Sequence, residues 1–188
     1  MKKVHFIGIG GIGISAIARF LKERNFIISG SDIADSAITK ELRANGMKIT
    51  VPHCKSAIED PDFVVYSAAI KSDNVELIEA RERGIECLSR KEALPFILEG
   101  KRVFAVAGAH GKSTTSAMLA ALMEGSVIIG AISKEFGSNM KYETSENLIF
   151  EADESDSSFL NSNPFLAIVT NAEPEHMEHY DNDIEKFH

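Results

Sequence analysis

The residues with the clearest chemistry lie in the stretch GAHGKSTT, residues 108–115, directly after the apolar run Arg102–Val106. A glycine-rich turn between a strand and a helix presents backbone N–H groups to an anion, and the helix dipole adds to that attraction. Lys112 is placed to bind terminal phosphates, and the hydroxyl of Ser113 is a ligand type that Mg²⁺ accepts. The usual pattern G-x-x-x-x-G-K-[ST] needs glycine at position 106, where this chain has valine, so the loop is shorter. The stretch predicts an ATP site with the following contacts: Gly108, Ala109, His110, Gly111, Lys112, Ser113 and Thr114.

A second glycine turn lies near the start of the chain, in HFIGIGGIGISAIA. Gly8, Gly10 and Gly13 fit the pattern G-x-G-x-x-G between a predicted strand and a predicted helix, and Asp32 follows nineteen residues after Gly13. Such a turn brings backbone close to a diphosphate, and an acid at that spacing is typical of a ribose contact. The pattern therefore predicts a nucleotide site without identifying the base. The competing interpretation is that the glycines only allow close helix–strand packing.

Carboxylates follow the apolar strand in NLIFEADESD. Ligands of open α/β sheets bind beyond the carboxyl ends of strands, so we expect Glu151 to lie near the phosphate loop and to bind a hard cation. The alternative is a solvated acidic loop, which is the usual setting of charge runs. His176 follows another predicted strand, Leu166–Thr170, and is a candidate metal ligand or phosphate contact. It lies three residues from His179, but no third nitrogen or sulfur ligand for zinc is evident nearby.

The composition is that of a globular protein, with 188 residues, 44% of them hydrophobic and 26% charged. A net charge of −8 argues against nonspecific nucleic-acid binding, because no basic excess is present to neutralise a phosphate backbone. Cys54 and Cys87 form neither a disulfide framework nor a zinc site, which favours a reducing compartment. We find no signal peptide or membrane span and expect a cytoplasmic protein that does not act at membranes.

Strands and helices are predicted to alternate along the chain, which indicates an α/β fold with mostly parallel sheets. The rhythm breaks around Pro95 and Gly100, so we expect two domains, residues 1–99 and 100–188. The chain ends in DNDIEKFH, a segment that is typical of a first helical turn. Because the chain stops where a helix is expected to begin, we expect the chain to be the N-terminal part of a longer protein. The predicted strands are 4–7, 26–29, 47–51, 63–66, 85–88, 102–106, 127–131, 148–150 and 166–170, and the predicted helices are 14–24, about 36–45, 75–83 and 112–123.

Four segments in this order resemble the Mur ligases: GIGGIGISAIA, VAGAHGKSTT, FEADESDSSFL and VTNAEPEHMEHY. The resemblance covers essentially the whole chain. It implies a Rossmann-like first domain that holds the UDP part of a UDP-sugar, followed by an incomplete P-loop domain that binds ATP and Mg²⁺. The activity that it implies is the ATP-dependent joining of L-alanine to UDP-N-acetylmuramic acid through an acyl phosphate, in peptidoglycan synthesis. A fragment of this length is expected to be inactive alone.

The resemblance also implies roles for individual residues. Lys112 would hold the β- and γ-phosphates, Ser113 and Glu151 would bind one Mg²⁺, and His176 would help to hold a second. The family usually has threonine at positions 109 and 113, where this chain has Ala109 and Ser113. The residues expected to contact the UDP-sugar are Gly10, Gly11, Ile12 and Gly13 at the phosphates and Asp32, Ser67 and Ala69 at the uridine or sugar. Those expected near the muramyl end are Asp153, Ser155 and Asp156.

Three other interpretations remain open at this point. The first glycine turn and Asp32, taken alone, are also typical of an NAD-dependent oxidoreductase, but that assignment gives the GAHGKSTT loop no purpose. A related ligase that adds a peptide to UDP-N-acetylmuramic acid is the nearest enzymatic alternative. A nucleotide-binding module without catalytic activity is the third. The oligomeric state is not predicted.

Overall fold

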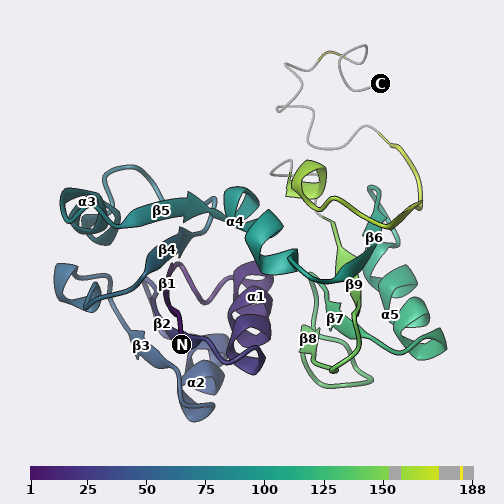
Figure 1. Cartoon of the computed structure of the whole chain (residues 1–188), viewed down its shortest axis with the longest axis horizontal. Coiled ribbons are helices and arrows are strands. Elements are labelled where there is room, and N and C mark those ends of the chain that lie inside the picture. Colours follow the sequence, from purple (N-terminus) through teal and green to yellow (C-terminus); the bar gives the residue numbers. More distant parts are fainter. Residues whose placement is uncertain (153–157, 174–182, 184–188) are drawn as a thin grey trace. The chain divides into compact units, whose positions relative to one another are not determined.

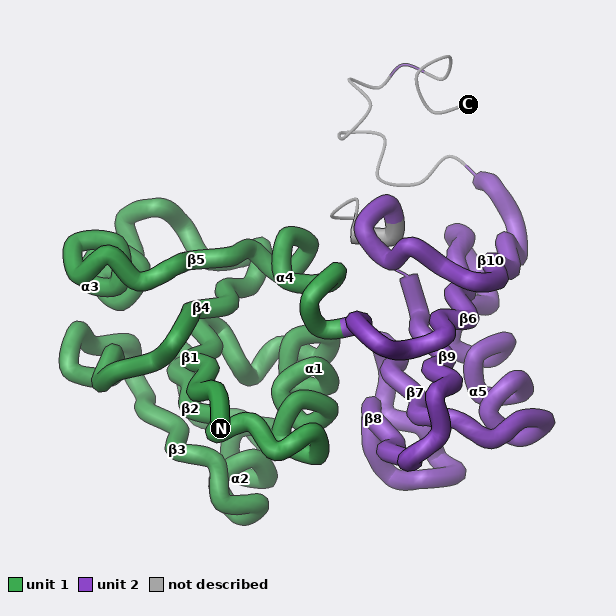
Figure 2. The backbone as a smooth tube through the Cα atoms, in the orientation of Figure 1, with its two compact units in different colours: residues 1–97 green, residues 98–188 purple. Residues whose placement is uncertain are grey.

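A computed structural model describes residues 1–152, 158–173 and 183. The chain divides into two compact units, Met1–Ile97 and Leu98–His188 (Figure 2). Several predictions concern residues outside the described part of the chain. They are the metal or phosphate role of His176, the contacts of Asp153, Ser155 and Asp156, and the helical turn expected in residues 184–188.

The first unit contains a parallel five-stranded sheet in the order β3-β2-β1-β4-β5. The order reverses between β1 and β4, the neighbouring strands at the centre of the sheet. In doubly wound folds, ligands bind beyond the carboxyl ends of the strands at such a reversal. The predicted α/β fold class is therefore confirmed. The strands are β1 (Lys3–Ile7), β2 (Ile27–Ser31), β3 (Lys48–Thr50), β4 (Phe63–Tyr66) and β5 (Glu86–Ser89).

Three helices connect the strands of this sheet: α1 (Ile12–Glu23), α2 (Ala37–Ala44) and α3 (Val75–Glu82) (Figure 1). Crossovers between parallel strands are right-handed, so α1 and α2, which lead toward β3, lie on one face, and α3, which leads toward β5, lies on the other. Ser36 caps the start of α2, because its hydroxyl accepts a hydrogen bond from the Thr39 N–H at 3.2 Å. A short 3₁₀ turn, η1 (Lys55–Ala57), follows β3.

The segment around Pro95 differs from the prediction, which placed an interruption there. Helix α4 (Arg90–Leu98) runs through Pro95. Its start is stabilised by Ser89 and Glu92: the Ser89 N–H donates to Oε2 of Glu92 at 2.7 Å, and the Glu92 N–H donates to the Ser89 hydroxyl at 3.4 Å. This reciprocal arrangement is a capping box, and the letters SRKE encode it.

The second unit has its own five-stranded sheet in the order β10-β6-β9-β7-β8, with α5 (Lys112–Leu122) packed against β6 and β9. All pairs are parallel except β7 with β8, a two-residue strand that the sequence did not predict. The apolar core of this unit includes Val127, Ile129 and Ile149. The other elements are β6 (Arg102–Ala107), β7 (Ser126–Ile128), β8 (Met140–Lys141), β9 (Asn147–Glu151), η2 (Ser158–Asn161) and β10 (Leu166–Val169).

Among the described residues, no helix combines the length and the apolar character that crossing a membrane requires.

Candidate functional site

The first glycine turn opens a cavity of about 590 Å³ at the carboxyl ends of the first sheet. Gly8 follows β1, Ser67 follows β4, and both line the cavity, which therefore lies at the reversal of strand order. A Cβ atom on Gly8 would lie 3.1 Å from Cβ of Ser67, so the close approach of the two turns needs a small residue there. The structure brings five of the residues predicted for the UDP-sugar to this cavity: Gly10, Gly11, Asp32, Ser67 and Ala69.

Asp32 is bound to the glycine turn itself. Its Oδ2 accepts a hydrogen bond from the Gly10 N–H at 2.7 Å, and its Oδ1 accepts one from the Ile33 N–H at 2.8 Å. A Cβ atom on Gly10 would lie 2.7 Å from Oδ2 of Asp32, so glycine is needed at this position. The carboxylate therefore lies between the turn and the edge of β2, where a ribose contact is expected.

The other two residues predicted at this turn lie in the first turn of α1. Ile12 begins the helix, and Gly13 follows it next to the guanidinium group of Arg90. A Cβ atom on Gly13 would lie 3.2 Å from Nη1 of Arg90. The structure thus adds a cation beside the amino end of α1, and sequence reasoning had not selected Arg90.

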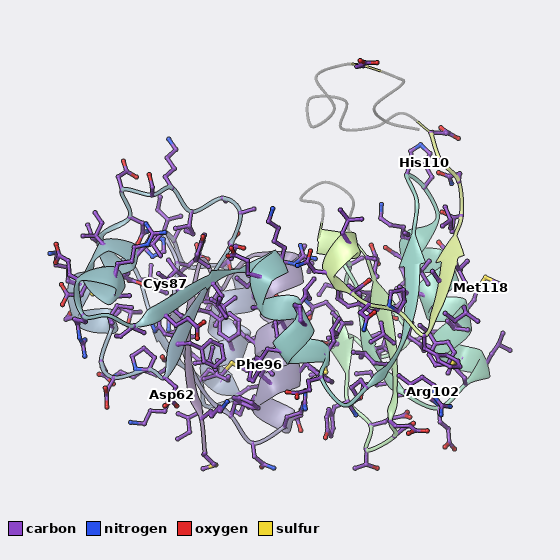
Figure 3. The ribbon with its side chains drawn as sticks, turned by 45° about the horizontal axis from the view of Figure 1, so that its top comes forward. Asp62, Cys87, Phe96, Arg102, His110 and Met118 are labelled. Carbon is purple, nitrogen blue, oxygen red and sulfur yellow. The ribbon has the colours of Figure 1, made fainter. Side chains whose placement is uncertain are left out.

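The second glycine turn connects β6 to α5. Gly111 is the N-cap of α5 and has a φ of 83°, in the left-handed region that favours glycine. Lys112 curls back over the loop, and its Nζ donates to the carbonyl oxygens of Gly108 at 2.7 Å and Ala109 at 3.3 Å. The ammonium group therefore lies over the turn whose amides are predicted to hold phosphate. Figure 3 marks His110 at the tip of this turn.

Residues that follow the neighbouring strand β10 hold this loop in place. The N–H of His110 donates to Oδ1 of Asn171 at 3.1 Å, and Nδ2 of Asn171 donates to the His110 carbonyl at 2.9 Å. The Thr170 hydroxyl donates to the same carbonyl at 2.6 Å. The contact is so close that a Cβ atom on Gly108 would lie 2.3 Å from Oγ1 of Thr170. Thr170 and Asn171, which we call the loop latch, were not predicted as site residues.

Glu151 reaches the start of α5. The Ser113 hydroxyl donates to its Oε2 at 2.9 Å, and the Gly130 N–H donates to the same oxygen at 3.1 Å. A hydroxyl oxygen and a carboxylate oxygen this close to each other are a suitable donor pair for one Mg²⁺ ion, so the two residues fit the predicted cation. Within the described ranges no group of three or more His, Cys, Asp or Glu side chains is arranged for metal binding.

A cavity of about 390 Å³ begins beside this pair, lined by Ser113, Thr114, Met118, Ile129 and Lys134 among others. It lies within the second unit, between the first turns of α5 and the segment after β7. Two of the predicted ATP contacts thus border a hollow large enough for part of a ligand.

A sequence profile of the Mur ligase family, described as the family's catalytic domain, matches residues 3–102, which is more than half of the chain. The chain belongs to the Mur ligase family. Among curated Mur ligases, the UDP-N-acetylmuramate–L-alanine ligase of Campylobacter curvus is 76% identical over 188 residues, and the enzyme of the same name from Helicobacter pylori strain P12 is 58% identical over 186. The match covers 100% and 98% of this chain but 43% and 41% of the relatives, so the chain spans less than half of their length.

Solved structures of Mur ligases have the same fold. The UDP-N-acetylmuramate–alanine ligase MurC of Thermotoga maritima superposes with a TM-score of 0.91 at 34% identity, covering 100% of this chain and 45% of that one. The UDP-N-acetylmuramate:L-alanyl-γ-D-glutamyl-meso-diaminopimelate ligase of Neisseria meningitides gives a TM-score of 0.86 at 26% identity and covers 100% and 67%. The Mur ligase fold therefore applies to both units of this chain.

Proposed function

We propose that this chain is the N-terminal part of an ATP-dependent ligase that joins L-alanine to UDP-N-acetylmuramic acid in peptidoglycan synthesis, in the cytoplasm. The observation that carries the proposal is the presence of two glycine turns, one in each unit, each at the carboxyl ends of parallel strands. Two separate anion sites suit a reaction with two phosphate-containing substrates. The names of the relatives at 76% and 58% identity support this choice of substrates.

In the second unit, the loop amides and Lys112 would bind the β- and γ-phosphates of ATP. Lys112 Nζ already lies over the loop, so it can exchange carbonyl oxygens for phosphate oxygens without a large movement. Ser113 and Glu151 would hold Mg²⁺, which when bound neutralises charge on the phosphates. The loop latch fixes the position of the turn, and positioning is the main protein contribution to phosphoryl transfer.

In the first unit, the cavity at the first glycine turn would bind the UDP part of the sugar substrate. The N–H groups at the amino end of α1 face the diphosphate, and Arg90, beside Gly13, adds positive charge there. Asp32 would contact the uridine, and Ser67 and Ala69 line the opposite wall, after β4.

A ligase that adds a peptide is the second candidate. The structural relative from Neisseria meningitides carries such a peptide in its name, but its identity of 26% is lower than the 34% of the Thermotoga maritima ligase. An NAD-dependent oxidoreductase is disfavoured, because it leaves the second loop, its latch and the Ser113–Glu151 pair without a role.

The proposal is tested by an ADP-release assay on the full-length protein that contains this chain, with ATP, Mg²⁺ and UDP-N-acetylmuramic acid. We expect ADP release that depends on L-alanine and not on the tripeptide, and that falls at least about 100-fold in Lys112→Ala, because that change removes a charge from the phosphates. Lys91→Ala, on the exposed surface of α4, is the matched control and should match the wild type. ADP release with the tripeptide alone would establish the second candidate instead.

A further inference from the structure

A buried chain of hydrogen bonds crosses the first sheet and ends at the nucleotide cavity. His5, Ser31 and Glu76 are at most 1% exposed, although all three are polar. Nε2 of His5 lies 3.1 Å from Oε2 of Glu76, and the Ser31 hydroxyl donates to the same oxygen at 2.5 Å. Nδ1 of His53 lies 2.8 Å from Oγ of Ser31, and His53 lines the cavity.

The direction of these hydrogen bonds follows from the charge of Glu76. Burial acts to raise the pKa of Glu76, but hydrogen bonds from His5, Ser31 and the Cys54 N–H outweigh it, so the pKa lies below its ordinary value. An ionised carboxylate only accepts hydrogen bonds, so the single hydroxyl proton of Ser31 points to Glu76. Ser31 must then accept from His53, and Nδ1 of His53 carries a hydrogen. Oε1 of Glu76, 3.7 Å from the same nitrogen, favours the same assignment.

In its neutral form, the ring of His53 therefore offers an acceptor. With the hydrogen on Nδ1, Nε2 has a free lone pair, and it is the one polar atom of the ring that the Ser31 contact leaves for a ligand. The side chain is 15% exposed, which is enough for one such contact.

The order of the strands places this acceptor relative to the glycine turn and Asp32, which are proposed to contact the diphosphate and the uridine. Gly8 follows β1, Asp32 follows β2, and His53 follows β3, and these strands are neighbours in the sheet. Adjacent strands lie about 4.8 Å apart, so the end of β3, which leads to His53, lies roughly 10 Å from the end of β1, which leads to the glycine turn. A diphosphate on the turn therefore directs its nucleoside toward Asp32 and His53 and the sugar away from them.

We propose that His53 recognises the nucleoside of the UDP-sugar by accepting a hydrogen bond at Nε2, and that buried Glu76, acting through Ser31, fixes the tautomer that makes this possible. The inference rests on the proposed function of the cavity. It makes Ser31 and Glu76 positioning residues and His53 a specificity-determining residue. The donor on the ligand is either the N3–H of the base or a hydroxyl of the ribose.

The ligand side is tested by calorimetric titration of the full-length protein that contains this chain with UDP, 3-methyl-UDP, 2′-deoxy-UDP and 3′-deoxy-UDP, for the wild type and His53→Ala. We expect His53→Ala to weaken UDP binding about fivefold, the usual effect of one neutral hydrogen bond. One of the analogues lacks the donor that His53 recognises. The wild type should bind that analogue about fivefold more weakly than UDP, whereas His53→Ala should bind it as well as it binds UDP. Equal losses in both proteins for every analogue would overturn the inference.

The tautomer is tested by long-range ¹H–¹⁵N spectra of the histidine rings, a measurement that needs no substitution. We expect an Nδ1–H tautomer for His53 in the wild type. In Glu76→Gln, the amide NH₂ that replaces Oε2 donates to Ser31, the hydroxyl turns toward His53, and the hydrogen moves to Nε2. UDP binding should then weaken about tenfold, because the Nε2–H of His53 would face the N–H or O–H donor of the nucleoside. Glu79→Gln, on the same helix and paired with Lys55, is the matched control and should change neither property.

The outcomes separate this inference from the proposed function. If the wild-type full-length protein binds UDP-N-acetylmuramic acid but the neutral ring of His53 carries its hydrogen on Nε2, the inference is wrong and the proposed function stands. If the wild-type full-length protein binds neither UDP nor the UDP-sugar, the proposed function is wrong as well. A tautomer that stays Nδ1–H in folded Glu76→Gln would show that Glu76 does not set it.

Discussion

The hydroxyl of Ser113 donates a hydrogen bond to Oε2 of Glu151 at 2.9 Å, although 38 residues separate them in the sequence. The sheet register explains the contact, because Glu151 pairs with Val106, the second-last residue of β6, which leads into the phosphate loop at Gly108. The strand that carries the carboxylate and the strand that leads into the loop are thus hydrogen-bonded neighbours. A hydroxyl oxygen and a carboxylate oxygen from different segments meet at one point as a result.

Replacing Glu151 by glutamine should weaken the Mg²⁺-dependent part of ATP binding. The amide keeps the size of the side chain but removes the negative charge that a cation requires, so we expect a loss of about tenfold or more. Titration of the full-length protein with ATP, with and without Mg²⁺, measures the effect. Binding without Mg²⁺ should change little, and equal losses in the two conditions would argue against a metal role.

Replacing Asn171 by alanine should loosen the phosphate loop. The change removes two hydrogen bonds to His110, each worth about 1 kcal/mol, and leaves Lys112 in place. We expect faster hydrogen exchange at the amides of the loop and ATP affinity lowered about tenfold. Asn161→Ala, in η2, serves as the control. Unchanged exchange at residues 108–111 would show that the latch does not hold the loop.

Replacing Gly10 by alanine should abolish UDP-sugar binding with little effect on ATP binding. The new Cβ atom would lie 2.7 Å from Oδ2 of Asp32 and 3.1 Å from Cγ2 of Thr39, so the turn must shift away from the carboxylate. Gly84→Ala is a useful comparison, because its φ of 70° is strained for alanine but nothing lies within 4 Å of the added atom. That variant should lower the melting temperature and leave ligand affinity unchanged.

The stability of the first unit should depend on pH through Glu76. Its pKa in the folded protein lies below the ordinary value of 4.5, so the ionised form stabilises the fold. This contribution is complete above pH 4.5 and is lost as the pH falls through the lowered pKa. Melting temperatures from pH 7 to pH 2 should therefore show a difference between wild type and Glu76→Gln that narrows below pH 4.5. A constant difference over the whole range would contradict the assignment.

The sequence predicted most elements of the fold because their signals are local. The apolar face of α1 and the cap of α2 are visible in a few neighbouring letters. The start of α4 was visible too, in the capping box Ser89–Glu92, but the proline received more weight than the cap. Strand β8 could not be predicted in this way, since its two residues form a strand only by pairing with β7.

The same difference between local and long-range signals applies to the residues of the candidate sites. Glycines, Lys112 and Asp32 belong to patterns with fixed spacing, so they are readable from one sequence. Arg90 and Asn171 are not, because each reaches its glycine turn from a distant part of the chain. The role proposed for His53 depends on a buried glutamate 23 residues away, which no local pattern connects to it.

The contact of Lys112 with the carbonyl oxygens of Gly108 and Ala109 has a consequence for the free protein. To bind a phosphate, the ammonium group would have to give up its hydrogen bonds to the loop carbonyls. The gain in affinity is therefore the difference between the free energy of the bonds to phosphate and that of the bonds to the loop. The same contact holds the side chain over the turn. A change that weakens the hydrogen bonds between Lys112 and the loop carbonyls should therefore tighten nucleotide binding.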